Sequence, residues 1–132
     1  MIRRSFFGSL AGLLGYASTA GAAGIERREN ARAELLRVPL AGYQFYDGDR
    51  VVTSLEKGMR LTLRREPDNP CDRNAVEIMT PDGVKLGYLP RSSVESIARN
   101  LDRGIPVQAE ISEVDPHAES WRRIYVECFV EI

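Results

Sequence analysis

The sequence of 132 residues is poor in the residues that build common catalytic and metal centres. It contains one histidine and two cysteines. A single histidine leaves no credible Ser-His-Asp grouping. Cys71, Cys128 and His117 lack the paired spacing of a zinc site, and the glycines are isolated rather than gathered in a phosphate-binding loop. We therefore expect no enzyme, no cofactor and no metal site.

The charges show no excess of either sign. Eighteen Lys and Arg residues stand against nineteen Asp and Glu residues, so the net charge is −1. This balance excludes a globally basic nucleic-acid-binding protein, although it allows a local basic patch. With 43% hydrophobic and 28% charged residues, a chain of this length is expected to form one globular domain.

The N-terminal residues 1–22 have the composition of an export signal. Arg3 and Arg4 are followed directly by Ser5-Phe6-Phe7, which is typical of the twin-arginine motif, and the segment ends in the small residues Ala20-Gly21-Ala22. Its apolar run is too short and too rich in glycine for a membrane-spanning helix of about 20 residues. We expect a cleaved signal and a periplasmic protein; an uncleaved anchor and a cytoplasmic location are the alternatives.

Cleavage after Ala22 would remove two arginines and no acidic residue. The remaining 110 residues would have 16 basic and 19 acidic side chains, a net charge of −3, which weakens non-specific attraction to phosphate backbones. The next segment, residues 23–37, is rich in Glu, Arg and Ala. We expect it to be a helical or flexible linker with a solvated charged face.

From residue 38 to residue 132 the patterns are those of a mainly β domain. Alternating apolar residues bounded by turn residues predict six short strands, over 38–46, 59–64, 75–80, 84–89, 107–111 and 124–132. Pro81-Asp82-Gly83 predicts a hairpin turn. One helix is expected, with a capping box of Ser92 and Glu95 at its start and Gly104 at its end. About six strands and one helix predict a small OB-like or SH3-like β-barrel.

Two spacings predict parts of the core. The helix should bury its regularly spaced apolar residues, Val94, Ile97, Ala98 and Leu101. The last strand should bury the residues of one side, Ile124, Val126, Cys128, Val130 and Ile132. Because Cys128 then lies in the core and Cys71 on a loop, we do not expect a disulfide between them.

The loop 64–76 is the most unusual stretch of the sequence. Pro67 and Pro70 stiffen it, and its Asn and Asp side chains can hydrogen-bond to their own backbone, so it should hold one shape. Its acidic residues lack the D-x-D-x-D-G pattern of a calcium-binding loop.

This loop carries a resemblance to a known family. The motif Arg-Glu-Pro-x-Asn-Pro-x-Asp-x-Asn-Ala-Val over 65–76, followed by Gly-Tyr-Leu-Pro-Arg over 87–91, resembles the HIRAN domain. The segment 41–48 is similar to the first strand and turn of that family, so the resemblance covers about 38–132. It implies a modified OB-like barrel that captures single-stranded DNA at its 3′ end. HIRAN domains occur in helicase-like DNA-repair ATPases and as free-standing bacterial proteins.

The resemblance also implies a DNA site. Matched position by position, its residues in this chain are Gln44, Phe45, Asp68, Cys71, Asp72, Tyr88 and Arg91. Phe45 would stack on a base, Arg91 would contact a phosphate, and Asp72 would accept a hydrogen bond from the terminal hydroxyl. Two positions differ from the family. Gln44 stands in place of an arginine, and Cys71 in place of an aromatic residue that would stack on a base for about 1–3 kcal/mol.

Two functions of different classes remain open. The first is a non-enzymatic nucleic-acid-binding module for single-stranded DNA ends. The second is an exported envelope protein that keeps the HIRAN barrel, has lost the DNA-end pocket and binds an unknown envelope partner. Outside the motifs, Trp121 and Tyr125 beside Arg122 and Arg123 could form a stacking and phosphate patch, or could simply begin a strand beside solvated arginines.

Overall fold

The computed structural model describes residues 31–132 of the chain. The predicted export signal, with Arg3 and Arg4, and the first part of the predicted linker lie outside the described residues. The chain divides into two compact units, and the larger one, Ala33–Val130, carries the features discussed below. None of the helices in residues 31–132 is long and apolar enough to cross a membrane.

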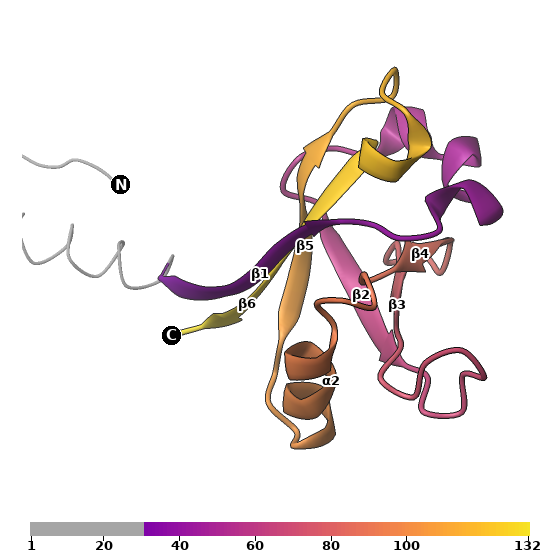
Figure 1. The fold of residues 1–132 in the computed structure, drawn as a ribbon. Coiled ribbons are helices and arrows are strands. Elements are labelled where there is room, and N and C mark those ends of the chain that lie inside the picture. Colours follow the sequence, from indigo (N-terminus) through magenta and orange to yellow (C-terminus); the bar gives the residue numbers. More distant parts are fainter. Residues whose placement is uncertain (1–30) are drawn as a thin grey trace, which may run out of the picture. The chain divides into compact units, whose positions relative to one another are not determined.

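Within the described residues, one curled antiparallel sheet of six strands forms a half-barrel with one α-helix, as the strand patterns predict (Figure 1). The strands are β1 (Arg32–Pro39), β2 (Arg60–Arg65), β3 (Val76–Met79), β4 (Lys85–Tyr88), β5 (Gln108–Val114) and β6 (Ile124–Glu131). Their order in the sheet is β1-β6-β5-β2-β3-β4. The first described strand therefore pairs with the last, and β4 forms the opposite edge.

The segment after β1 brings the two edges of the sheet together. Ala41 forms an antiparallel bridge with Tyr88 of β4, with N–O distances of 2.8 and 3.0 Å. A Cβ at Gly87 would lie 2.6 Å from the carbonyl oxygen of Ala41. Because only glycine permits such a close approach of two backbones, Gly87 of the Gly-Tyr-Leu-Pro-Arg motif is needed for the curl of the sheet.

The first part of the domain differs from the sequence-based prediction. Residues 32–37, predicted as helix or linker, belong to β1, because pairing with β6 overrides their helix propensity. The strand predicted over 38–46 stops at Pro39. Three 3₁₀ turns follow it, η2 (Tyr43–Phe45), η3 (Gly48–Arg50) and η4 (Val52–Ser54).

Helix α2 (Glu95–Asp102) packs its apolar face on the core. Val94, Ile97 and Ala98 are buried there, as predicted. The predicted capping box is wrong: no side chain caps the helix, which begins directly after Val94, and Ser92 lies in the preceding turn. Burial of Val94 fixes the helix start two residues later than a serine cap would.

The end of α2 agrees with the prediction. Gly104 adopts a φ of 80°, and its N–H donates to the carbonyl of Leu101 at 3.0 Å. The N–H of Ile105 donates to the carbonyl of Asn100 at 3.0 Å. These two bonds form a Schellman motif, which requires the left-handed conformation that glycine adopts without strain.

In β6 the predicted alternation holds only as far as Cys128. Ile124, Val126 and Cys128 are buried, but Phe129 is buried as well, and Ile132 is 78% exposed. Phe129 lies on the other side of the strand, where the Arg60 guanidinium covers its ring at 5.1 Å. Cys71 is exposed and Cys128 is buried, and both are free thiols. Burial raises the pKa of the Cys128 thiol to about 12.

Candidate nucleic-acid interface

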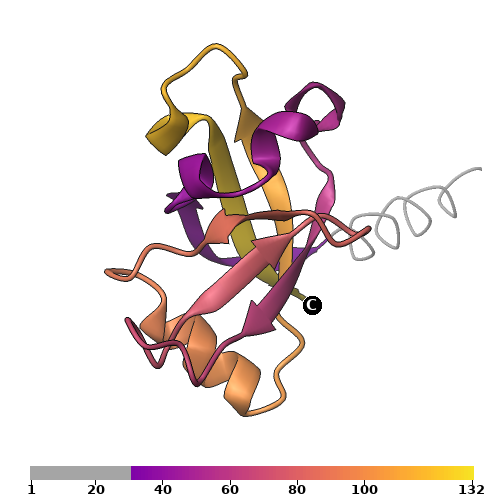
Figure 2. The ribbon, with the colours of Figure 1, turned by 90° about the vertical axis from the view of Figure 1, so that its right-hand side faces the viewer.

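Tyr88 lies where three segments of the predicted site meet. Its backbone bridge to Ala41 brings η2 beside β4 (Figure 2). Its hydroxyl donates to Glu66 Oε1 at 2.7 Å, which joins it to the loop after β2. The N–H of Leu89 donates to the carbonyl of Val76 at 3.1 Å, so the chain after β4 runs beside the end of the same loop.

Charged side chains from β2, β3, β4 and the loop after β2 surround this tyrosine. Together with Tyr88 they form what we call the Tyr88 cluster: Arg64, Glu66, Glu77, Lys85 and Tyr88. Glu77 is only 3% exposed, yet it lies in β3 between two cations. Arg64 donates to Glu77 Oε1 at 2.6 Å, and Lys85 Nζ lies 3.2 Å from Oε2. These ion pairs offset the desolvation of the buried carboxylate.

Lys85 is held between two aromatic rings. Its Nζ lies 4.2 Å from the ring centre of Tyr46 and 4.4 Å from that of Tyr88, and it also donates to the Tyr88 hydroxyl oxygen at 2.8 Å. Partial burial opposes the charge of Lys85, but the bonds to Tyr88 and Glu77 outweigh burial, so its pKa is raised. Lys85 therefore stays protonated and pairs inside the cluster.

Glu66 is the acidic group that joins the cluster to the loop. Burial by itself raises the pKa of Glu66. Hydrogen bonds from Tyr88 and Asn69, together with the charges of Lys85 and Arg64, lower it by more, so the pKa lies below its ordinary value. Two cations thus face two carboxylates, and the Tyr88 cluster has no net charge.

The loop after β2 is folded by bonds of the kind predicted for its Asn and Asp residues. Asn69 Oδ1 accepts the N–H groups of Cys71 and Asp72 at 2.8 and 3.2 Å, and Asp72 Oδ1 accepts the N–H of Asn74 at 2.9 Å. Asn69 Nδ2 also donates to Glu66 Oε1 at 3.0 Å. A single asparagine therefore links the loop backbone to the Tyr88 cluster.

Arg65 fastens the far side of this loop to the helix. Its Nη1 donates to the carbonyls of Arg73 and Ala75 at 3.0 and 2.9 Å. Its Nε and Nη2 donate to the two carboxylate oxygens of Asp102 at 2.9 and 3.2 Å. This bidentate geometry fixes the loop against α2.

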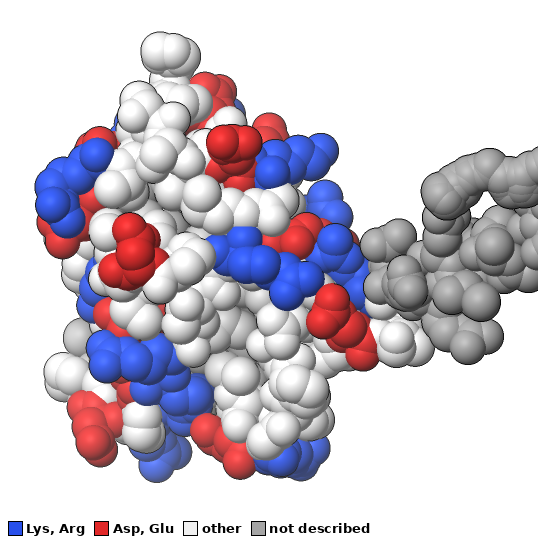
Figure 3. Space-filling model, turned by 180° about the vertical axis from the view of Figure 1, so that it is seen from behind, with Lys and Arg blue, Asp and Glu red and all other residues white. Residues whose placement is uncertain are grey.

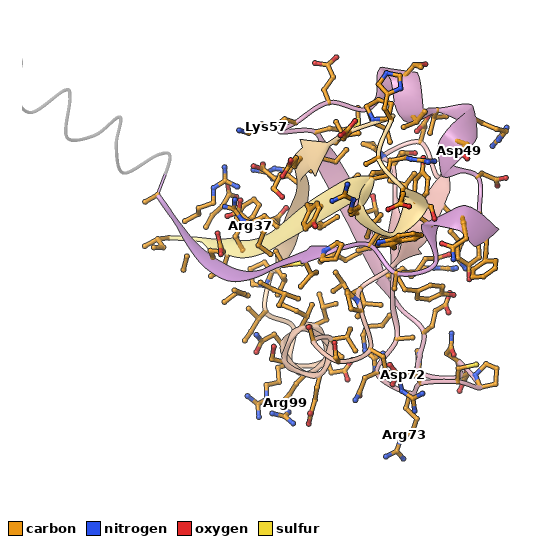
Figure 4. The ribbon with its side chains drawn as sticks, turned by 45° about the horizontal axis from the view of Figure 1, so that its top comes forward. Arg37, Asp49, Lys57, Asp72, Arg73 and Arg99 are labelled. Carbon is orange, nitrogen blue, oxygen red and sulfur yellow. The ribbon has the colours of Figure 1, made fainter. Side chains whose placement is uncertain are left out.

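The predicted site residues lie on three segments that meet at Tyr88: η2, the loop after β2 and the end of β4. In η2, Gln44 is exposed and Phe45 exposes 74% of its surface. On the loop, Asp68 and Cys71 are exposed and Asp72 is half-buried. Figure 4 shows Asp72 at one end of the domain, with the neighbouring Arg73 extending away from it.

Arg91 lies in the turn after β4, at the end of the sheet to which the loop belongs. Its side chain is exposed and forms no ion pair or hydrogen bond with any residue that the structure describes. The antiparallel register pairs Tyr88 with Glu77, and the bond from Leu89 to Val76 continues it. Arg91 therefore follows β4 at the end where Asp72 precedes β3.

A buried tyrosine anchors the turn that displays Phe45. Tyr43 is 1% exposed, and its hydroxyl donates to Asp49 Oδ1 at 3.1 Å. A Cβ at Gly48 would lie 2.2 Å from the Tyr43 ring, so the chain is packed directly against it. Burial and then Asp49 raise the pKa of Tyr43 to about 12. Tyr43 thus fixes η2 against the core, while Phe45 faces solvent.

Sequence reasoning missed the Tyr88 cluster apart from Tyr88. The sequence predicts that Arg64 faces outward from a short strand and that Glu66 belongs to the loop, and nothing in it indicates that Lys85 meets them. The one available signal was Glu77, a charge between the apolar Val76 and Ile78, because a carboxylate in a buried strand needs cations on the neighbouring strands.

Mixed charges and a small pocket are found on other parts of the described surface. Acidic and basic side chains are interleaved on the face drawn in Figure 3. A pocket of about 300 Å³ beside η4 contains none of the predicted site residues and is lined by Val51, Ser54, Leu55, Met59, Thr80, Pro81 and Asp82. Within residues 31–132 no three His, Cys, Asp or Glu side chains are grouped so that they could hold a metal ion.

Curated relatives share a short part of their length with this chain. It is 33% identical over 82 residues to the helicase-like transcription factor of Oryctolagus cuniculus, which covers 62% of this chain and 7% of that protein. It is 33% identical over 69 residues to the Fanconi-associated nuclease 1 homolog of Arabidopsis thaliana, which covers 52% of this chain and 7% of that protein. The chain thus spans only a small fraction of the length of these relatives.

Two solved structures have a similar fold. A protein from Lactobacillus plantarum is 26% identical, with a TM-score of 0.66 over 75% of this chain and 94% of that chain. The HIRAN domain of human HLTF is 19% identical, with a TM-score of 0.55 over 76% of this chain and 80% of that chain. The family model of the HIRAN domain matches residues 33–132, from β1 to the last residue. With this match over most of its length, the chain belongs to the HIRAN domain family.

Proposed function

We propose that this chain is a non-enzymatic nucleic-acid-binding module that holds the end of a single strand of DNA beside Tyr88. The observation that carries the proposal is the exposed ring of Phe45, displayed by a turn packed against β4, the strand that leads to the unpaired Arg91. Nucleobases stack on such rings whatever their sequence. The anchored turn keeps this ring in solvent, where a base can reach it.

Each contact in this proposal has a separate physical role. Phe45 stacks on the terminal base, and the Arg91 guanidinium pairs with a phosphate. Asp72 uses Oδ1 for the N–H of Asn74 and offers its second oxygen to the terminal 3′ hydroxyl. The Tyr88 cluster has no net charge, so it supports these groups without attracting phosphate. With one phosphate contact, log K should fall with log salt with a slope of about −0.7.

The test is a titration of the full chain with a fluorescently labelled single strand at low salt, followed by anisotropy. Phe45→Ala should weaken binding by a factor of about 5 to 150, the value of one stacked base. Arg91→Gln should weaken binding and flatten the salt dependence. Arg103→Gln is the matched control, because Arg103 is exposed just after α2. A strand with a 3′ phosphate should bind more weakly than one with a free 3′ hydroxyl.

The proposal fails if the wild-type chain shows no saturable binding to either strand. It also fails if Phe45→Ala and Arg91→Gln bind as well as Arg103→Gln does. Thermal unfolding of each variant serves as a check on its fold.

A second candidate is an envelope interaction protein that keeps the barrel without a working DNA-end pocket. Gln44 and Cys71 favour it, because both are exposed at the site and supply neither a guanidinium nor a ring. The double variant Gln44→Arg with Cys71→Tyr separates the two candidates. If the wild-type chain does not bind a single strand and the double variant does, the pocket has been lost and the second candidate is favoured.

Export is part of this proposal for the whole chain. It is supported by the paired Arg3 and Arg4 and by the small residues that end at Ala22. A reporter fused to residues 1–24 should reach the periplasm, and Arg3→Lys with Arg4→Lys should abolish its export. Unchanged export of the variant would contradict the twin-arginine mechanism.

A further inference from the structure

The turn that displays Phe45 is short and depends on support from other parts of the chain. η2 has only three residues. The N–H of Phe45 donates to the carbonyl of Gly42 at 2.9 Å, and the N–H of the next residue, Tyr46, donates to that of Tyr43 at 3.3 Å. The hydrogen bonds of 3₁₀ turns have poorer geometry than those of an α-helix. The direction of the Phe45 ring therefore depends on what holds this turn in place.

Asp49 of η3 accepts two hydrogen bonds on one carboxylate oxygen. The hydroxyl of Tyr43 donates to its Oδ1 at 3.1 Å, and Nη1 of Arg123 donates to the same atom at 2.7 Å. We call these three residues the Asp49 triad. The pKa of Tyr43 is raised to about 12 by burial and then by Asp49, so the hydroxyl stays protonated and continues to donate. Asp49 thus links the buried ring of η2 to a residue 74 positions later in the chain.

Arg123 reaches the triad from the fixed frame of the sheet. It directly precedes β6, and its carbonyl accepts the N–H of Asp115 at 2.9 Å. The next residue, Ile124, is buried in the core. Nε and Nη2 of Arg123 both donate to the carbonyl of Ala118, at 3.0 and 2.9 Å, so the planar guanidinium is already oriented before it meets Asp49. The position of Asp49 is therefore set by the sheet.

Three turns from distant parts of the sequence meet at the triad. Both η3 and η5 (Ser120–Arg122) lie beside η2 (Figure 1). The guanidinium of Arg123 also lies 5.5 Å from the ring centre of Tyr43. Figure 4 shows Asp49 among these turns, away from Asp72 and the loop after β2. Asp49 is therefore placed to act on the turn that carries Phe45 rather than on the strand end.

The ion pair of the triad is partly open to water. The side chain of Asp49 is 68% exposed and that of Arg123 is 19% exposed. Ion pairs with an exposed partner contribute little to global stability. The pair can therefore be broken while the core stays folded, and the ring of Tyr43 stays buried. What changes is the conformational freedom of η2, the turn that carries Phe45.

We propose that Asp49 and Arg123 are positioning residues for DNA binding, which hold η2 so that the Phe45 ring is oriented for stacking before the strand arrives. This inference rests on the function proposed above, in which the terminal base stacks on Phe45. A ring that is already oriented loses less conformational freedom on binding. Ordering one side chain costs a factor of about 2 to 10 in affinity, and the triad removes this cost.

The sign of the effect separates positioning from electrostatics. Asp49→Ala removes a negative charge from the surface, so electrostatics alone would leave the affinity for DNA unchanged or raise it. Positioning predicts the opposite, a loss by a factor of about 2 to 10 in the anisotropy titration of the full chain. Asp47→Ala is the matched control, because Asp47 is 62% exposed and pairs with Arg50, outside the triad. It removes the same charge and should not weaken binding.

Conservative variants test the bonds themselves. Asp49→Asn keeps an oxygen that accepts from Tyr43 and Arg123, so it should restore most of the affinity that Asp49→Ala loses. Arg123→Lys keeps the charge but lacks the planar fork that bonds to Ala118 and Asp49 together, so it should bind about as weakly as Asp49→Ala. Thermal unfolding of each variant should stay close to that of the wild type, since the pair is partly exposed.

A strand whose 3′-terminal nucleotide carries no base isolates the role of Phe45. Wild type and Asp49→Ala should bind this strand equally, because it offers nothing for the ring to stack on. In a Phe45→Ala background, Asp49→Ala should cause no further loss with the intact strand. NMR order parameters of the Phe45 and Tyr46 amides should fall in Asp49→Ala, whereas those of β5 and β6 should not change.

The outcomes separate this inference from the proposed function. If Phe45→Ala weakens binding but Asp49→Ala binds as well as Asp47→Ala, the positioning role is disproved and the proposed function stands. The role is also disproved if Asp49→Ala weakens the intact and the abasic strand by the same factor. If the wild-type chain binds no strand, the proposed function fails and the positioning role fails with it. Should Asp49→Ala unfold, the same comparisons made with Arg123→Lys decide.

Discussion

The Tyr88 cluster and the aromatic rim are neighbours that are built in opposite ways. The aromatic rim is our name for the exposed aromatic side chains of the described residues, Phe45, Tyr46 and Trp121. In the cluster every charged side chain has a partner, and Glu77 is bonded to cations on both sides. In the rim, Phe45 and Trp121 expose most of their surface. Tyr46 connects the two, because its ring contacts Lys85 at 4.2 Å and lies 5.9 Å from the ring of Tyr88. The cluster is therefore closed by its own ion pairs and hydrogen bonds, whereas the rim leaves aromatic surface in solvent.

The largest loss of stability is expected when the backbones of Gly87 and Ala41, which meet beside Tyr88, are forced apart. In Gly87→Ala the new Cβ would lie 2.6 Å from the Ala41 carbonyl oxygen. We expect a loss of about 3 kcal/mol in the free energy of unfolding, measured by urea titration. Gly58→Ala is the control, because Gly58 also has a positive φ but nothing lies within 4 Å of its Cβ position. Equal losses in the two variants would show that the close approach is unimportant.

A smaller effect is expected from Glu77→Gln, which removes the negative charge between Arg64 and Lys85. The variant should lose about 2 kcal/mol of stability, less than a fully buried ion pair would, because Arg64 is largely exposed. Phe45→Ala, in the rim, should change stability by no more than about 0.5 kcal/mol. The comparison of the two regions would be wrong if the rim variant were as destabilised as the cluster variant in the same urea titration.

The smallest effect is the pH dependence contributed by Glu66. Its pKa in the folded chain lies below the ordinary 4.5, so its contribution to stability is complete above pH 4.5 and is lost as the pH falls through the lower folded value. Stability of the wild type should therefore fall more steeply below pH 4.5 than that of Glu66→Gln. Glu56→Gln, an exposed residue outside the cluster, is the control and should keep the wild-type slope in acid denaturation.

Local patterns in the sequence predicted much of the fold. The hairpin at Pro81-Asp82-Gly83 forms as expected, with the N–H of Gly83 donating to the carbonyl of Thr80 at 3.0 Å. The alternation in β2 and the spacing in α2 gave the correct buried sides. These features were accessible because each depends on residues that are close in sequence, where periodicity and turn chemistry act directly.

The errors arose where distant parts of the chain decide the local structure. β1 has the composition of a helix, and only its pairing with β6, at the other end of the domain, makes it a strand. Ser92 and Glu95 match a capping box, but the burial of Val94 sets the start of α2.

The candidate site was predictable only in part, for the same reason. The family motif identified Phe45, Tyr88 and Arg91, but not the side chains that hold them. Lys85 meets Glu77 only because the register of β3 and β4 brings these residues together. Trp121 lies beside η2 because Arg123 bonds to Asp49, 74 residues earlier in the chain. Contacts of this kind need three-dimensional coordinates.

The pairing of β1 with β6 has a consequence for how the domain acquires its structure. The two strands lie at opposite ends of the domain, so β1 cannot pair until β6 has been synthesised. Until then β1 has no partner strand, whereas the β2–β3 and β3–β4 hairpins can already form. Because contacts between such distant segments slow folding, we expect the last phase of refolding to be the docking of the N-terminal strand.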